Sequence, residues 1–118
     1  MKFTGKVIKG DGRGRKLGFP TLNLKTSLIL EDGVYIARAD GLASVMHVGR
    51  LPTFSIDEKR VEIHVLDVDD DWYGREVTVE VFDKIREVEK FDSVKSLVKA
   101  IEGDVKKARE FFCRVGEM

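Results

Sequence analysis

The sequence predicts a single mainly β domain, an antiparallel barrel with one helix at its carboxyl end. Three observations favour this fold class. Apolar and polar residues alternate with a period of two over most of the chain up to Phe82, which is typical of half-buried strands. The alternating segments are short and separated by Gly and Asp turns, with no helix between them, which favours antiparallel over parallel pairing. After Phe91 the apolar period becomes that of a helix.

Most of the predicted strands are rich in β-branched residues. The clearest segments are residues 3–8, 34–39, 44–48, 61–66 and 77–82. Asp40-Gly41 lies between two of them and predicts a tight hairpin turn. The sequence therefore indicates five or six short strands.

The carboxyl-terminal segment predicts a helix that Asp92 or Ser93 can cap. Its apolar residues recur at steps of three and four, so they form one stripe that can lie across the barrel and seal one end. Gly103 falls inside the helix at a cost of about 1 kcal/mol relative to alanine, and close packing would explain it. The stripe consists of Val94, Leu97, Val98, Ile101, Val105, Ala108 and Phe112.

Composition limits the class of protein. A chain of 118 residues with 42% hydrophobic residues can bury one core, so we expect one domain over residues 1–118. The single cysteine, Cys113, allows no intramolecular disulfide and suggests a reducing compartment. No segment resembles a signal peptide or approaches the roughly 18 apolar residues of a membrane span. We therefore expect a cytoplasmic monomer with no membrane partner.

Charge is balanced over the whole chain but not locally. The 21 basic and 21 acidic residues give a net charge of zero, which argues against a general electrostatic grip on nucleic acid. Between Lys9 and Lys25, however, there are five cations and one acid, and between Asp57 and Asp71 there are seven acids and two cations. The sequence thus predicts one local site for an anion.

The acidic run at residues 67–71 is not a calcium loop. Trp72 stands where such a loop needs glycine, and Thr78 where it needs glutamate. We interpret the run as a solvated hairpin tip closed by Tyr73-Gly74, because Asp and Gly are common turn residues.

The most informative segment is residues 10–24, which combine four glycines, three cations and a Pro-Thr-x-Asn turn. We call residues 10–18 the glycine loop. Glycine can adopt positive φ and approach a ligand without a Cβ, so several N–H groups can converge on one anion. The spacing matches neither a Walker loop nor a dinucleotide fingerprint, so a bound nucleotide would be held on a β scaffold.

The segment at residues 10–24 resembles the signature loop of riboflavin kinases of the bacterial and eukaryotic type. Four further segments agree in order and spacing. They are Gly33-Val34-Tyr35, the Val48–Phe54 segment, Val61-Glu62-Ile63-His64, and a tail with Arg86, Lys90-Phe91-Asp92-Ser93, Leu97, Ile101, Asp104 and Ala108. The resemblance implies a six-stranded antiparallel Greek-key barrel with a helix packed against it. It also implies transfer of the ATP γ-phosphate to the ribityl 5′-hydroxyl of riboflavin, which gives FMN.

The resemblance also implies where ATP and Mg²⁺ bind. Thr21 and Asn23 match the family's Mg²⁺ ligands, and on an extended segment both point to the same side. Leu22 stands where the family has alanine and points to the opposite side, so we expect local repacking there. The nucleotide-binding residues implied by the match are Gly10, Gly12, Arg13, Gly14, Arg15, Lys16, Gly18, Pro20, Thr21 and Asn23.

Glu62 matches the family's catalytic glutamate, which implies a general base for the ribityl hydroxyl. His64 lies on the same strand face, and we expect it to have a structural or supporting role. For the flavin, the resemblance implies Arg86 and Ser93, while Glu89 is placed by spacing alone.

Other interpretations compete with an enzyme of this kind. In many bacteria the family's domain follows an adenylyltransferase half, and because Met1 lies directly at the first strand we expect a stand-alone kinase or an excised domain. One alternative is a non-catalytic flavin- or nucleotide-binding module on the same barrel, motivated by Leu22. Another is a barrel that binds single-stranded nucleic acid through the glycine loop. Zero net charge and the lack of aromatics beside Arg13 and Arg15 argue against it.

Overall fold

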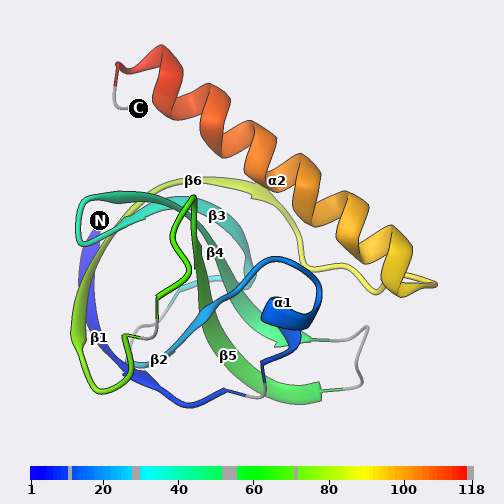
Figure 1. The fold of residues 1–118 in the computed structure, drawn as a ribbon, viewed down its shortest axis with the longest axis horizontal. Coiled ribbons are helices and arrows are strands. Elements are labelled where there is room, and N and C mark those ends of the chain that lie inside the picture. Colours follow the sequence, from blue (N-terminus) through cyan, green and yellow to red (C-terminus); the bar gives the residue numbers. More distant parts are fainter. Residues whose placement is uncertain (11, 28–29, 52–55, 71, 117–118) are drawn as a thin grey trace.

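The computed structural model describes residues 1–10, 12–27, 30–51, 56–70 and 72–116, and the Pro52–Phe54 part of the family motif lies outside them. Within these ranges, six strands close into a barrel with a long helix on its outer surface (Figure 1). The strands are β1 (Lys2–Ile8), β2 (Leu22–Lys25), β3 (Gly33–Ala39), β4 (Leu42–Leu51), β5 (Ile56–Val65) and β6 (Glu76–Arg86). The helices are α1 (Arg13–Lys16) and α2 (Val94–Arg114). Neither helix is long and apolar enough to span a membrane.

The strand order around the barrel is β1-β2-β5-β4-β3-β6, and every neighbouring pair is antiparallel. This confirms the predicted barrel. One detail was wrong: β5 and β6 are not neighbours, so the acidic run between them is a crossing connection and not a hairpin tip. Turn residues mark where a chain can reverse, but they do not determine which strand it joins next.

The predicted hairpin at Asp40-Gly41 is confirmed. Both residues have positive φ, 48° and 84°, as a two-residue turn of the I′ type requires, and β3 and β4 pair up to Ala39 and Leu42 on either side of it. The Asp40 carboxylate also accepts a 2.9 Å hydrogen bond from the Thr78 backbone N–H, which ties the turn to β6.

Alternate residues of every strand fill the barrel. Met46, Ile63, Val77 and Val79 have no exposed surface, and they belong to one core cluster that takes residues from all six strands. In a small barrel such side chains fill the interior completely. The intervening residues lie on the outer face.

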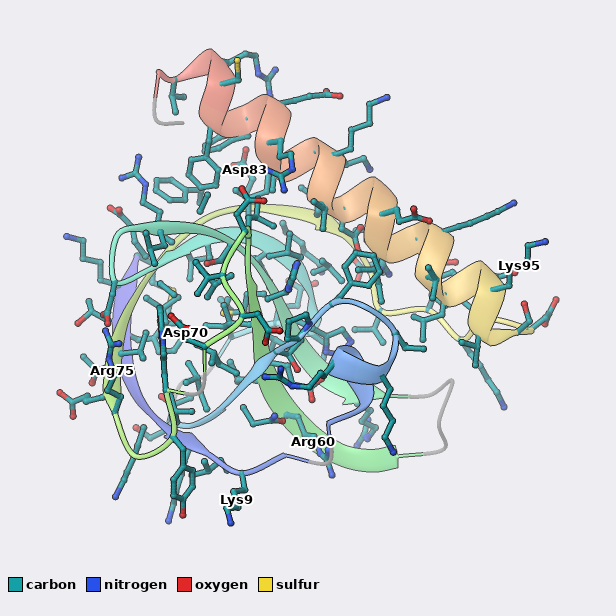
Figure 2. All side chains as sticks on the ribbon, viewed as in Figure 1. Lys9, Arg60, Asp70, Arg75, Asp83 and Lys95 are labelled. Carbon is teal, nitrogen blue, oxygen red and sulfur yellow. The ribbon has the colours of Figure 1, made fainter. Side chains whose placement is uncertain are left out.

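Helix α2 packs on this outer face and does not seal an end of the barrel. Its buried residues Asp104, Ala108 and Phe112 lie on one stripe, and the last two join an apolar cluster with Val34 and Ile36 of β3, Val45 of β4 and Leu66. The helix takes this position because the interior is already filled, while an apolar strip remains uncovered on β3 and β4. Charged side chains, Lys95 among them, project from its opposite side (Figure 2).

Polar contacts fix α2 at both ends. Ser93 caps it by accepting a 3.1 Å hydrogen bond from the Ser96 backbone N–H, as predicted for one of two candidates. Near the other end, the Arg109 guanidinium donates bonds of 2.9 and 2.7 Å to Asp67 and lowers the pKa of that carboxyl. Close packing does not explain Gly103, because a Cβ there would meet nothing within 4 Å.

Candidate functional site

The glycine loop folds directly against the side chains of the Pro-Thr-x-Asn turn. A Cβ on Gly10 would lie 2.0 Å from the Asn23 amide nitrogen. A Cβ on Gly14 would lie 2.4 Å from the Phe19 carbonyl oxygen and 3.2 Å from the Thr21 hydroxyl. Only glycine permits these approaches, so Thr21 and Asn23 lie under one stretch of backbone.

The loop is also held in shape by its own backbone. The Phe19 N–H donates a 2.7 Å hydrogen bond to the Gly14 carbonyl, and the single turn of α1 contributes longer bonds of 3.1 Å. Gly12 and Gly18 have φ of 73° and 92°, which confirms the predicted use of positive φ. Residues 12–19 therefore form a hydrogen-bonded backbone element next to the turn.

The turn directs its residues as the spacing predicts. Leu22 pairs with Ile63 and packs on the barrel core, while Leu24 is also buried there. Asn23, between them, therefore faces outward. The larger side chain at Leu22 packs against the core cluster, and it also lines the two pockets beside the glycine loop.

Glu62 lies directly opposite Asn23. The register of β2 and β5 pairs these two residues, and Ile63 beside Glu62 points into the core. Directly opposed residues on one face of an antiparallel pair have Cβ atoms about 4.5–5.5 Å apart. Backbone pairing thus places a half-buried carboxylate next to the amide of the Pro-Thr-x-Asn turn.

His64 contacts the backbone of the Pro-Thr-x-Asn turn, in agreement with the expected structural role. Its Nδ1 lies 2.8 Å from the Pro20 carbonyl oxygen, and because a carbonyl can only accept, Nδ1 carries the proton and donates. The edge of Phe19 packs against the imidazole, with ring centroids 5.6 Å apart. The two contacts fix the peptide that precedes Thr21.

A cavity of about 180 Å³ opens beside the loop. The predicted residues Gly10, Gly12, Arg15, Thr21 and Asn23 line it together. A smaller adjoining pocket shares Arg15 and Thr21 and reaches Trp72. The structure therefore brings five of the ten predicted nucleotide-binding residues to this cavity, and Pro20 lines the smaller pocket beside it.

Six lining residues were not among the predicted nucleotide-binding residues: Val7, Ile8, Lys9, Leu22, Asp70 and Tyr73. Tyr73 is 58% exposed, and the Lys9 ammonium lies 5.6 Å from its ring centroid. Figure 2 shows Lys9 at the periphery of the barrel, pointing away from it. The sequence did offer Tyr73, an aromatic residue in a polar turn, as a signal of a binding surface, but Tyr73 was interpreted only as a turn residue.

The predicted cations differ in their surroundings. Arg15 forms a 2.6 Å ion pair with Asp69, in which both side chains are more than half exposed, so it contributes only about 0–1 kcal/mol. Lys16 is exposed, and the side chain of Arg13 lies outside what the structure describes. An anion entering the cavity would therefore compete with Asp69 for Arg15.

The predicted flavin residues lie from the end of β6 to the start of α2. Arg86 donates two 2.8 Å hydrogen bonds to the buried carboxylate of Asp104, and its guanidinium lies 5.6 Å from the ring of Phe91. Ser93 is the cap of α2, and Glu89 is exposed. Their role toward a flavin stays a prediction.

One row of paired residues runs from the Pro-Thr-x-Asn turn to the predicted flavin residue Arg86. Going from β2 through β5, β4 and β3 to β6, strand pairing aligns Asn23, Glu62, His47, Val34 and Arg86 across the outer face. We call these residues the outer row. A carboxylate beside two oxygen-bearing side chains, under a glycine-rich backbone, is an arrangement suited to phosphoryl transfer, which depends on positioning and charge neutralisation.

Comparison with known proteins identifies the family. Residues 1–112 match the model of the riboflavin kinase family, Flavokinase. The chain is 38% identical over 117 residues to the bifunctional riboflavin kinase/FMN adenylyltransferase of Escherichia coli (strain K12), covering 93% of this chain and 37% of that protein. This chain belongs to the riboflavin kinase family, which confirms the resemblance predicted from the sequence.

Two further comparisons agree. The chain is 38% identical over 122 residues to the RNA-binding riboflavin kinase RibR of Bacillus subtilis (strain 168), covering 98% of this chain and 53% of that protein. The crystal structure of riboflavin kinase from Trypanosoma brucei superposes with a TM-score of 0.64 at 22% identity, over 94% of this chain and 78% of that one. The second comparison supports the fold. The chain thus spans about half or less of the length of the two curated relatives, the Escherichia coli bifunctional protein and RibR.

Proposed function

We propose that this chain is an ATP- and Mg²⁺-dependent riboflavin kinase that transfers the γ-phosphate of ATP to the ribityl 5′-hydroxyl, giving FMN. Family membership supports the proposal. The observation that carries it is the pairing of Asn23 with Glu62 beneath the glycine loop. This pairing supports a role for Glu62 as a proton acceptor beside the place where phosphates would bind.

Thr21 and Asn23 fit a magnesium ion. A hydroxyl and an amide carbonyl are oxygen donors of the kind that Mg²⁺ prefers, and both side chains line the cavity of about 180 Å³ beside the glycine loop. Two protein oxygens are sufficient, because Mg²⁺ takes its other ligands from phosphates and water. When bound, the ion supplies neutralisation of the charge that develops on the phosphate oxygens.

The residues of the chain then divide the work. As the ribityl oxygen forms a bond to the γ-phosphorus, the bond from that phosphorus to the β,γ-bridging oxygen breaks and ADP leaves. The Glu62 carboxylate accepts the hydroxyl proton and later releases it to water. The glycine loop orients the phosphates through its N–H groups, and His64 keeps the Pro20 peptide, and with it Thr21, in place.

The remaining assignments follow the same layout. Arg15 would leave Asp69 to pair with a phosphate, and Arg86, Glu89 and Ser93 would lie toward the flavin ring. The name of RibR describes that relative as RNA-binding. That this chain binds no nucleic acid therefore stays a prediction, as do a monomeric state and a cytoplasmic location.

The test is conversion of riboflavin to FMN with ATP and Mg²⁺, followed by chromatography. Glu62→Gln should lower kcat by roughly 10² or more, because general base catalysis contributes about 10²–10⁴-fold. Its thermal unfolding should match that of the unaltered chain. Glu76→Gln, an exposed strand glutamate on β6, is the matched control and should keep full turnover.

Two outcomes would count against the proposal. Unchanged kcat in Glu62→Gln would remove this residue from the role of base. Tight FMN binding by the unaltered chain without any turnover would instead support the non-catalytic flavin-binding alternative.

Omission of Mg²⁺ should abolish turnover, and Asn23→Ala should raise the Mg²⁺ concentration needed for half-maximal rate.

A further inference from the structure

His47 occupies the position next to Glu62 in the outer row. On β4 it lies between Met46 and Val48, both of which are buried inside the barrel, so its imidazole is on the outer face. Strand register pairs it with Glu62 on one side and with Val34 on the other. The ring is half-buried.

The imidazole carries an unused polar atom. Its Nδ1 is buried and has no hydrogen-bond partner within the part of the chain that the structure describes. Burial, and secondarily the Arg86 guanidinium, lowers the pKa of His47 to about 4 in spite of the opposing Asp32 carboxylate, so the ring is neutral at pH 7. Buried polar atoms in native proteins are nearly always paired, so an orphaned one requires an explanation.

The position of His47 relative to the substrate offers that explanation, and this step rests on the proposed function. The reacting 5′-hydroxyl would lie at Glu62 on β5, and the flavin ring would lie toward Arg86 on β6. The barrel order between these strands is β5-β4-β3-β6, so the substrate crosses β4 first. Neighbouring strands lie about 4.8 Å apart, a distance that a five-carbon polyol chain can bridge.

We propose that His47 is a substrate-binding residue, and that its imidazole hydrogen-bonds a secondary hydroxyl of the ribityl chain and thereby holds the 5′-hydroxyl in front of Glu62. A neutral imidazole has one donor and one acceptor nitrogen, and a hydroxyl can pair with either. The ring needs only a rotation about χ2, a torsion with broad minima, to turn its unpaired nitrogen toward the polyol. The polyol would then satisfy the atom that the protein leaves unpaired.

Two flavins separate this role from a structural one. Riboflavin carries the ribityl chain, whereas lumiflavin has the same ring with a methyl group in its place. In His47→Phe, the Kd of riboflavin, measured by quenching of flavin fluorescence, should rise about tenfold, as expected for the loss of one hydrogen bond. The Kd of lumiflavin should stay within twofold. The KM for riboflavin should rise similarly while the KM for ATP does not.

Stability provides the second measurement. Because His47→Phe replaces an unpaired buried nitrogen with carbon, its melting temperature should equal or exceed that of the unaltered chain. His47→Gln, which restores a donor and an acceptor, should recover part of the riboflavin affinity. As a histidine control, His64→Phe should disturb the Pro20 contact and raise the KM for ATP, while leaving the ratio of riboflavin to lumiflavin affinity unchanged.

The outcomes also distinguish this inference from the proposed function. Turnover in the unaltered chain together with unchanged riboflavin affinity in His47→Phe would overturn the role of His47 alone. Equal weakening of riboflavin and lumiflavin would also overturn it, because the contact would then be with the ring. Absence of turnover in the unaltered chain would instead contradict the kinase.

Discussion

The outer face of β3, β4 and β5 is divided into two regions that differ in polarity. At Ile36 and Val45 it is apolar, and α2 covers it with Ala108 and Phe112, which have no exposed surface. Two residues along the same strands, at His47 and at the neighbouring Glu62, it is polar and half-buried. One sheet surface therefore packs against a helix in one region and carries the residues of the proposed site in the other.

The boundary between these regions is the pair of Arg86 and Asp104. Asp104 is 3% exposed and accepts both of its 2.8 Å hydrogen bonds from Arg86, which pairs in register with Val34 of the outer row. A buried carboxylate at this point needs its partner, because an unpaired buried charge is costly. Asp104, the buried residue of α2 nearest its amino end, therefore also holds Arg86, one of the predicted flavin residues.

Among substitutions that test the difference between the two regions, Phe112→Ala should have the largest effect. Removal of a fully buried ring from the helix-covered region should lower the free energy of unfolding by about 3–5 kcal/mol. Urea unfolding measures the loss. Below the melting temperature, kcat should stay within about twofold, and a large fall in kcat with an intact fold would show that the two regions are coupled.

A pH titration of stability should give the next largest effect. The pKa of His47 is about 4 in the folded chain and near 6.5 when unfolded, so between these values the unfolded state binds more protons. Stability should therefore fall as pH drops from about 6.5 to 4, by up to about 3 kcal/mol at roughly 1.4 kcal/mol per pKa unit. The charged groups that act on the ring are Arg86 and Asp32, and Glu62 is its partner on the neighbouring strand.

Because carboxyl groups elsewhere also titrate in this range, the comparison is with His47→Gln. The difference in unfolding free energy between this variant and the unaltered chain should change steadily across the window and level off below pH 4. A difference that is independent of pH would contradict the lowered pKa.

Gly14→Ala, in the glycine loop beside the polar region, should affect nucleotide use and leave the helix-covered region unchanged. The added Cβ would meet the Phe19 carbonyl at 2.4 Å, so the glycine loop must move relative to Thr21. Displacement of a binding group by about 1 Å can cost around 10²-fold in rate, so kcat/KM for ATP should fall by roughly this factor. Steady-state kinetics at varied ATP measures it, and unchanged kinetics would argue that the loop does not orient the nucleotide.

The smallest effect should come from Gly103→Ala, on the exposed side of α2. No neighbour lies within 4 Å of the added Cβ, so the change should raise the free energy of unfolding by about 0.5–1 kcal/mol through helix propensity. It also serves as the control for Gly14→Ala, since activity should not change. A loss of stability would mean that the helix needs glycine here.

Much of the fold could be predicted because periodicity reports which residues share a face. The alternation was sufficient to place Leu22 opposite to Asn23 and to put Glu62 and His64 on one face of their strand, and the hairpin at Asp40-Gly41 depended on local turn chemistry. The pairing of β5 with β2 and β4 could not be read in this way, because it depends on contacts between distant segments. For the same reason, the docking of α2 on the outer face was missed.

The site was predicted best where a backbone constraint leaves a mark in the sequence. Gly10 and Gly14 are glycines because the Asn23 side chain and the Phe19 carbonyl, respectively, approach them closely, and this requirement is visible in the sequence as a run of glycines. His47 carried no such mark, since a histidine on a strand is ordinary until its neighbours across the sheet are known. Asp70 was assigned to solvent because acidic turns usually face it.

The register of β2 has a consequence for how this domain tolerates change. Sliding the four-residue strand by one position would push the Asn23 amide into a hydrocarbon interior and expose Leu22 and Leu24 to water. A chain with this register shift would therefore lose folding stability, whatever the shift does to catalysis. Insertions or deletions in the surrounding loops can accumulate without altering the spacing of the two groups opposed across β2 and β5, because packing inside the barrel keeps them aligned.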